Sequence, residues 1–339
     1  MDLRKRDMTN DSNDSNDESP KRVRREDSKL YVPLPLQLYP EAPHYDANRV
    51  LRMRVLGDTV ARIGALSAAE IEAIRNKGMD DRPKLLAVEA KTELRVLVVE
   101  RDTLDLAKEV FEALGVAPLV LNMANETHPG GGYRSGSAAQ EENLFRRSDL
   151  HFCFNPGEVI VDPCHPDRQC YSTRMQHLLS GTDGRVYISD APRICIRSSE
   201  DFNHSTLGYE LYGQDEAFPF YEMRSAAFIA SRSKDSEEFQ ARRRIRAQLA
   251  SARESGHRVL VLSAFGCGAF GGTPELVARI YAEELKKRED FFSLVAFGIF
   301  YAGWGPNNYD VFRKVFQDHF DNESLRIGRS DYDKRVSRL

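Results

Sequence analysis

The chain has 339 residues, of which 41% are hydrophobic and 29% are charged, and its formal net charge is −4 at pH 7. This composition indicates a globular protein that buries a large core in one large or two ordinary domains. The nearly balanced charge argues against a general polyanion-binding surface, which requires clustered Lys and Arg. We therefore expect no direct sequence-specific binding of nucleic acid.

Residues 1–44 are predicted to be a disordered, charged tail. The stretch 1–30 has no aromatic residue and carries many charges of both signs, so it cannot offset the entropy of folding by burying apolar surface. Its basic run, Lys21 to Arg25, has the composition of a short nuclear-import signal. The five cysteines and the lack of a secretory segment predict a reduced, intracellular protein, cytoplasmic or also nuclear.

Residues 46–76 have helical spacing, and Ser67 with Glu70 predicts a capping box at the start of a second helix. An alternation of strands and helices follows, which is typical of an α/β fold. The expected strands are 94–100, 117–124, 225–231, 257–265 and 293–301, and the expected helices are 103–115, 236–254, 274–287 and 307–318, with a further helix after the first glycine loop.

Residues 155–224 are predicted to form an irregular insertion with short strands at 185–189 and 193–198. The end of the chain, 326–339, is expected to be a frayed tail. The predicted organisation is therefore a tail at 1–44, one domain with a helical lead-in at 45–320, and a C-terminal tail at 321–339.

No membrane segment or metal site is expected. The uncharged, largely apolar stretch at residues 291–305 is shorter than the roughly 20 apolar residues that a membrane helix needs, and it is rich in strand formers. Cys153, Cys164 and Cys170 could suggest zinc, but they lack the paired C-x-x-C spacing of structural zinc sites.

The first glycine loop lies in the stretch "LNMANETHPGGGYRSGSAAQEENLFRR", Leu121 to Arg147. One interpretation is an ordinary helix start, in which Ser137 and Gln140 form a capping box and Glu141 and Glu142 complement the helix dipole. Three glycines after a proline, however, remove more side chains than a turn requires. Bare backbone of this kind suits close approach by a ligand.

The second glycine loop, "FGCGAFGGTPE", follows a strongly apolar strand and opens a helix, where backbone amides favour an anion. Gly266, Gly268 and Gly271 also satisfy G-x-G-x-x-G, so a nicotinamide-dependent oxidoreductase is an alternative. The next strand has no acidic residue at its end to bind a ribose, which argues against that alternative. Because both loops follow strands, together they suit a ligand with a diphosphate between two sugars.

The segment "NMANETHPGGGYRSGSAAQEENLFRR" resembles the signature of poly(ADP-ribose) glycohydrolases, in which a GGG triplet precedes QEE by six to eight residues; here seven residues intervene. The "GCGAFGG" segment is similar to the diphosphate loop of the same enzymes. The order of the motifs resembles the microbial-type branch, and the resemblance spans about residues 46–320. It implies a macrodomain: a three-layer α/β/α fold with a mixed, mostly parallel sheet.

The resemblance also implies roles for individual residues. Glu142 would be the catalytic carboxylate, Glu141 would bind ribose hydroxyls, and Gln140 would complete the motif. Asn125 would bind the distal ribose, and Asp102 would lie near the adenine. The remaining substrate-binding positions implied by the motifs are Gly130, Gly131, Gly132, Gly266, Cys267, Gly268, Ala269, Phe270 and Gly271.

The expected activity is hydrolysis of the ribose–ribose O-glycosidic bond of poly(ADP-ribose), with Glu142 as general acid and base. The substrate would be the polymer or an ADP-ribosylated protein; no cofactor is expected, and we expect a monomer. Two alternatives stay open: an ADP-ribose-binding macrodomain without hydrolytic activity, and a mono-ADP-ribosyl hydrolase. The intact Gln140-Glu141-Glu142 triplet favours an enzyme.

Overall fold

The structure is a computed structural model, and it describes residues 46–78, 94–165, 168–228, 236–301, 307–320 and 325–328, together with Leu36 and Leu38. The tail predicted at 1–44 lies outside these ranges except for those two leucines. The basic run Lys21 to Arg25 also lies outside them.

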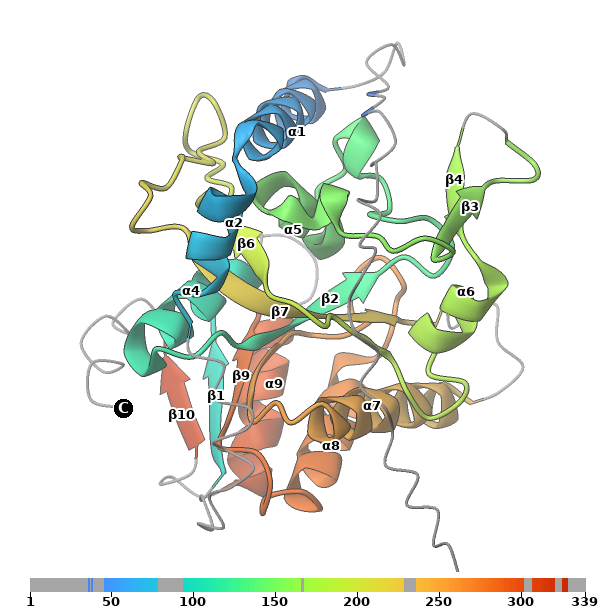
Figure 1. The fold of residues 1–339 in the computed structure, drawn as a ribbon. Helices are drawn as coiled ribbons and strands as arrows, with labels where there is room; N and C mark the ends of the chain where they lie inside the picture. Colours follow the sequence, from blue (N-terminus) through green and yellow to red (C-terminus); the bar gives the residue numbers. More distant parts are fainter. Residues whose placement is uncertain are drawn as a thin grey trace, which may run out of the picture.

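Two helices, α1 (Ala47–Ala65) and α2 (Ala68–Arg75), form the N-terminal lead-in. The capping box predicted at Ser67 is confirmed: its hydroxyl accepts a hydrogen bond from the Glu70 amide, while the Glu70 carboxylate accepts one from the Ser67 amide at 2.8 Å. In Figure 1, α1 lies at the top of the molecule, where it contacts the helix that follows the first glycine loop, and α2 lies below it and contacts β6 and β7.

A mixed, mostly parallel sheet forms the centre of the molecule, with strand order β10-β1-β9-β8-β2-β7-β5 and with β6 paired to β7. The neighbours from β10 to β7 are all parallel, whereas β5 and β6 run antiparallel to β7. The strands are β1 (Arg95–Val99), β2 (Leu119–Ala124), β5 (Tyr187–Ile188), β6 (Arg193–Cys195), β7 (Phe218–Ala226), β8 (Val259–Leu262), β9 (Leu294–Gly298) and β10 (Leu325–Gly328).

Helices cover both faces of this sheet (Figure 1). Successive side chains of a strand point to opposite faces, and on each face the apolar ones are buried under these helices. Val96 and Val98 of β1 pack with α7, α8 and α9, whereas Leu97 and Val99 pack with α1, α4, α5 and α6. The helices that complete the layers are α4 (Thr103–Leu114), α5 (Gln140–Arg147), α6 (Thr173–Leu179), α7 (Glu237–Glu254), α8 (Pro274–Lys286) and α9 (Asn308–His319). A separate hairpin, β3 (Val159–Val161) with β4 (Gln169–Tyr171), lies outside the sheet.

Two sequence-based assignments need correction. The strand expected at 225–231 is β7, which begins at Phe218 and ends at Ala226; residues 229–231 lie outside the described ranges. The frayed tail expected at 326–339 is wrong for its first residues, because 325–328 form β10, parallel to β1. In both cases pairing with a neighbouring strand selects a segment that local composition does not identify.

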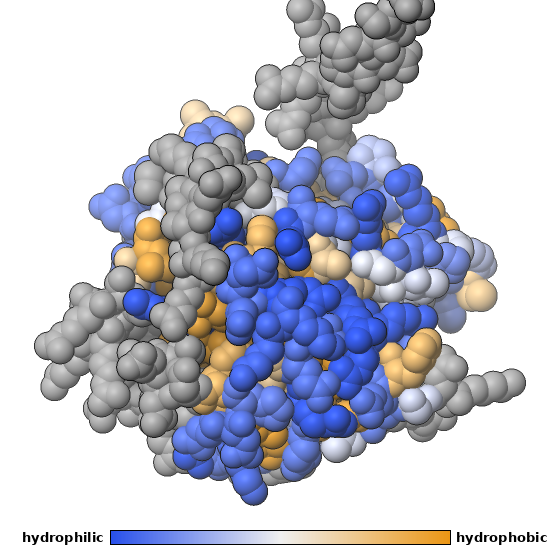
Figure 2. Space-filling model, turned by 90° about the horizontal axis from the view of Figure 1, so that it is seen from below, coloured by the Kyte–Doolittle hydropathy of each residue, from blue (hydrophilic) through white to orange (hydrophobic). Residues whose placement is uncertain are grey.

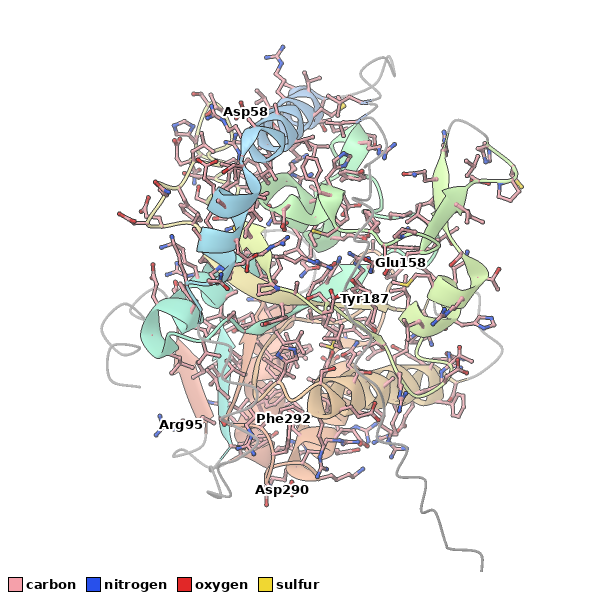
Figure 3. All side chains as sticks on the ribbon, in the orientation of Figure 1. Asp58, Arg95, Glu158, Tyr187, Asp290 and Phe292 are labelled. Carbon is pink, nitrogen blue, oxygen red and sulfur yellow. The ribbon has the colours of Figure 1, made fainter. Side chains whose placement is uncertain are left out.

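The strand β7 was hard to predict because it buries two charged residues. Glu222 and Arg224 are fully buried, and their side chains pair at 2.7 Å. Burial raises the pKa of Glu222, but the charges of Arg224 and Arg193 outweigh it and the net pKa is lowered. Glu158 and Tyr187 lie close together beside this strand (Figure 3), where Arg224 contacts both.

The outer surface on the α7 side is mainly hydrophilic (Figure 2). Ion pairs join α7 to α8 there, including Arg242 with Glu283 at 2.7 Å and Arg246 with Glu284 at 3.0 Å. Among the described residues, no helix is long and apolar enough to cross a membrane, and no group of three or more His, Cys, Asp or Glu side chains could hold a metal ion.

Candidate active site

The first glycine loop connects the end of β2 to the start of α5, at the carboxyl end of the parallel sheet. Gly130 and Gly131 have φ values of 73° and 54°, in the left-handed region that favours glycine. The Gly131 amide donates to the His128 carbonyl at 3.0 Å, and the chain then turns through the short 3₁₀ helix η1 (Tyr133–Ser135). The loop therefore folds back on itself before α5 begins.

Gln140 does not cap α5, contrary to the expectation from the S-x-x-Q spacing. The N-cap position is Ala139, and no side chain caps the helix. Instead, the Gln140 amide nitrogen donates to the Leu121 carbonyl at 2.6 Å, and its carbonyl oxygen accepts from the Met123 amide at 2.9 Å. Gln140 thereby ties the start of α5 to β2.

This contact explains how the sheet opens at the site. β2 pairs with β8 only through Leu119 and Val120, although β2 continues to Ala124. Beyond Val120 the backbone of β2 would lack partners on the β8 side, and Gln140 supplies them at Leu121 and Met123. The two strands thus separate where the two glycine loops leave them.

Glu141 is buried, with 3% of its surface exposed, and it holds the glycine loop against the strand end. Its two carboxylate oxygens accept hydrogen bonds from the backbone amides of Asn125 at 2.7 Å and Gly130 at 3.1 Å. Burial, and next the charge of Glu142, raise the pKa of Glu141 well above its ordinary value, despite those amides. These contacts account for a structural role; binding of ribose hydroxyls by Glu141 stays a prediction.

Glu142 lies beside Glu141 but uses its carboxylate differently. Its Oε1 accepts from the Gly132 amide at 2.8 Å, and its Oε2 has no hydrogen-bond partner among the described residues. A Cβ atom added to Gly131 would lie 2.6 Å from that Oε1 and 3.0 Å from a Glu141 oxygen. Close packing of the two carboxylates against the backbone therefore requires glycine at position 131, whether or not a ligand also approaches it.

Asn125 lies at the end of β2 with its carboxamide oxygen already engaged. That oxygen accepts hydrogen bonds from the amides of Thr127 and His128, both at 2.8 Å, which fixes the turn into the glycine loop. The nitrogen of the same side chain is the end that remains to contact a ligand. Asn125 also lines a cavity beside the loop.

Asp102 has a structural function that the sequence did not reveal. It is the N-cap of α4, where it accepts from the Leu104 amide at 2.8 Å, and it forms an ion pair with the buried Arg147. Asn143 of α5 also donates to it at 2.7 Å. Asp102 thus joins α4 to α5, and it also lines a cavity at the end of β1.

The second glycine loop follows β8, the neighbour of β2 in the sheet, so both loops lie at the same edge. Gly266 and Gly271 have φ values of 76° and 70°. Gly268 is different: its φ is not in the left-handed region, and a Cβ there would meet nothing within 4 Å. Conformation therefore does not require glycine at 268. Of the remaining loop residues, Ala269 is exposed, and Cys267 and Phe270 are half-buried.

Two cavities flank the start of α5. One, of about 370 Å³, lies at the carboxyl ends of β1, β2, β8 and β9 and at the start of α5. Its lining includes Asp102, Met123, Gln140 and Ser263. The other, of about 390 Å³, is lined by Asn125 and the glycine loop and extends towards β4. The second glycine loop lines neither of these two cavities.

Two aromatic residues in the first cavity were missed by sequence analysis. Phe202 and Phe300 are 51% and 56% exposed, and their rings lie nearly parallel, 6.4 Å apart between centroids and inclined by 16°. They come from the insertion and from the end of β9, nearly 100 positions apart in the chain. Only the exposure of two large apolar side chains at one cavity identifies them.

Comparison with known proteins supports the resemblance seen in the sequence. Residues 59–178 match the family described as microbial-type PARG, catalytic domain. This range includes the first glycine loop and Gln140 to Glu142, and it ends before the second glycine loop. No curated protein matches the chain.

Solved structures with the same fold include a poly(ADP-ribose) glycohydrolase from Thermomonospora curvata, with 24% identity and a TM-score of 0.52, covering 78% of this chain and 99% of that one. The structure of the same enzyme bound to the inhibitor ADP-HPD has 24% identity and a TM-score of 0.50, covering 78% and 98%. The expected fold class and the resemblance to microbial-type poly(ADP-ribose) glycohydrolases are confirmed.

Proposed function

We propose that this protein hydrolyses the ribose–ribose O-glycosidic bonds of poly(ADP-ribose) and releases ADP-ribose, with Glu142 as general acid and base. One observation carries the assignment to Glu142 rather than Glu141. Glu141 uses both oxygens to hold the backbone of Asn125 and Gly130, whereas Glu142 uses only Oε1, on Gly132. Its Oε2 is the carboxylate oxygen that remains for chemistry.

The proposed reaction begins with a proton on Glu142 Oε2, since Oε1 accepts the Gly132 amide. Oε2 donates this proton to the glycosidic oxygen as the bond from that oxygen to the anomeric carbon breaks, and an oxocarbenium-like ribose results. The Glu142 carboxylate then takes a proton from a water molecule that adds to the anomeric carbon. The products are ADP-ribose and a polymer shortened by the cleaved unit.

The two ends of the terminal ADP-ribose unit would occupy opposite sides of the gap between β2 and β8. We assign the adenine to the cavity with Phe202 and Phe300, because nearly parallel exposed rings suit a flat heteroaromatic base. The second glycine loop would bind the diphosphate through backbone amides, with open space at Gly268. The ribose would then lie at Asn125 and Glu142.

The test compares Glu142→Gln with Glu141→Gln. Glu142→Gln should lower the rate of ADP-ribose release from polymer by about 10²–10⁴-fold, because the general acid and base is lost, while its urea midpoint and its affinity for ADP-ribose stay near wild type. Glu141→Gln should also lower stability, by about 1–3 kcal/mol, because its amide would place a donor against a backbone amide. Wild-type turnover in Glu142→Gln would refute the assignment.

The same assay separates the alternatives. An ADP-ribose-binding macrodomain would bind ADP-ribose with the wild-type chain and leave polymer length unchanged. A mono-ADP-ribosyl hydrolase would release ADP-ribose from protein that carries single units and would not shorten polymer. Following chain length and released product over time, with the wild-type protein on both substrates, distinguishes the three functions.

A further inference from the structure

The cavity beside the glycine loop differs in charge from the cavity with the aromatic pair. The aromatic cavity is lined by four acidic residues and one arginine: Glu100, Asp102, Asp105, Glu200 and Arg101. The cavity beside the glycine loop is lined by two arginines, Arg134 and Arg168, and, in the described part of the chain, by no acidic residue. The electrostatic field therefore favours a phosphate group in the cavity beside the glycine loop and opposes one in the aromatic cavity.

Arg134 is held in position by uncharged groups. Its Nε donates to the Tyr133 hydroxyl at 3.0 Å and its Nη2 donates to the Gln169 carboxamide at 3.4 Å, while the guanidinium lies 5.4 Å from the centre of the Tyr133 ring. Tyr133 is itself buried and contacts His151 at 3.1 Å. These contacts fix the guanidinium without neutralising its charge, which is the arrangement that an anion site needs.

The field of Arg134 acts on this region in a second way. Burial, and next the charge of Arg134, lower the pKa of His151 to about 4. His151 is consequently neutral near pH 7 and contacts Tyr133 as an uncharged imidazole. The positive charge in this part of the cavity therefore belongs to Arg134 and not to the histidine behind it.

The cavity begins where the proposed catalytic carboxylate lies. Gly131 and Gly132 line it, and the same two glycines pack against Glu142. The volume of about 390 Å³ is in the range of small-molecule sites. In the polymer, the oxygen that leaves belongs to the ribose of the next unit, whose 5′ carbon carries that unit's diphosphate. The leaving unit thus brings phosphates to within one ribose ring of the cleaved bond.

We propose that this cavity binds the leaving ADP-ribose unit, and that Arg134 contacts its diphosphate. The proposal rests on the proposed function and adds a second nucleoside-diphosphate subsite to it. Arg168, whose backbone amide donates to the His165 carbonyl at 2.8 Å, lines the outer part of the same subsite. Arg134 is accordingly a determinant of preference for polymer over leaving groups that lack phosphate.

The test uses two substrates with the same cleaved bond. One is the ADP-ribose dimer, and the other is ADP-ribose joined through the same ribose–ribose bond to adenosine, which lacks the second diphosphate. Arg134→Met should raise KM for the dimer by about tenfold or more, because a charge-assisted hydrogen bond is lost, with kcat nearly unchanged. KM for the adenosine-ended substrate should change less than about twofold. Arg134→Lys, which keeps the positive charge, should raise KM for the dimer less than Arg134→Met does.

The matched control is Arg253→Met, which removes an exposed arginine from the end of α7 near Phe291, beyond the opposite edge of the sheet. This control variant should change neither KM nor kcat for either substrate. If Arg134→Met raised KM equally for both substrates, or left KM for the dimer unchanged, the proposed subsite would be refuted. Affinities for both compounds are also measured in Glu142→Gln. If the wild type cleaves neither compound but Arg134→Met weakens binding of the dimer alone, the proposed function fails and the subsite stands.

Discussion

The substitution Gly131→Ala tests whether the bare backbone of the glycine loop sets the position of Glu142, the proposed catalytic carboxylate. The added Cβ would lie 2.6 Å from Glu142 Oε1, well inside the 3.4 Å at which ordinary contact begins. Glu142 must therefore move by several tenths of an ångström or lose the Gly132 amide. The φ of 54° adds strain of about 1–2 kcal/mol for an L-residue.

We expect Gly131→Ala to lower the free energy of unfolding by about 1–3 kcal/mol and kcat on polymer by about 10²-fold. The loss of kcat should exceed any rise in KM, because the carboxylate is displaced while the cavities on either side persist. Urea unfolding gives the first quantity, and the initial rate of ADP-ribose release gives the second.

Gly268→Ala is the matched control, since its φ is outside the left-handed region and its Cβ would meet nothing within 4 Å. Its stability should stay within about 0.5 kcal/mol of wild type. If Gly131→Ala kept wild-type kcat, close packing against Gly131 would not position Glu142. If Gly268→Ala were equally destabilising, the contrast between the two loops would be wrong.

Three further predictions concern neighbouring features. Gly268→Val should leave the urea midpoint unchanged but weaken ADP-ribose binding at least about tenfold in calorimetry, because the side chain enters space assigned to the diphosphate; unchanged affinity would contradict that assignment. Gln140→Ala should cost about 2 kcal/mol in urea unfolding, because the Leu121 carbonyl and the Met123 amide lose their partners; a neutral effect would mean that water replaces the side chain. Glu284 has a pKa lowered to about 2, since its hydrogen bonds to Lys287, Arg288 and Arg246 outweigh burial, so its contribution is present above about pH 4.5 and is lost as pH falls towards 2. Because Arg246 and Lys287 are half exposed, the free energy of unfolding of the wild type should fall by only about 1 kcal/mol more than that of Glu284→Gln between about pH 5 and about pH 3. If urea unfolding gave the same pH dependence of this free energy for both proteins, the prediction would be contradicted.

Local patterns were sufficient where one segment carries its own signal. The capping box of Ser67 and Glu70 was predicted and confirmed, because both partners lie within four residues of each other. The spacing from GGG to QEE likewise identified the loop and the helix that hold Glu141 and Glu142. The same local reasoning failed at Gln140, where a helix cap was expected and a contact with β2 was found.

The tertiary structure decided which distant segments share the site. The first residues of β7 were not predicted as strand, because Glu222 and Arg224 are charged. These two residues can be buried there because their partners Arg193 and Asn122 come from other strands. Phe202 and Phe300 meet across one cavity from two unrelated segments.

The amino-acid sequence by itself determined the α/β alternation, the two glycine loops and the carboxylate pair, because these are periodic or contiguous features. The resemblance implied different roles for the two carboxylates, but only the tertiary structure gave a physical difference between them. Both follow Gln140 in the first turn of α5, yet Glu141 meets the amides of Asn125 and Gly130 while Glu142 leaves one oxygen available. That difference depends on where β2 separates from β8, and strand separation is a property of the assembled sheet, not of any local run of residues.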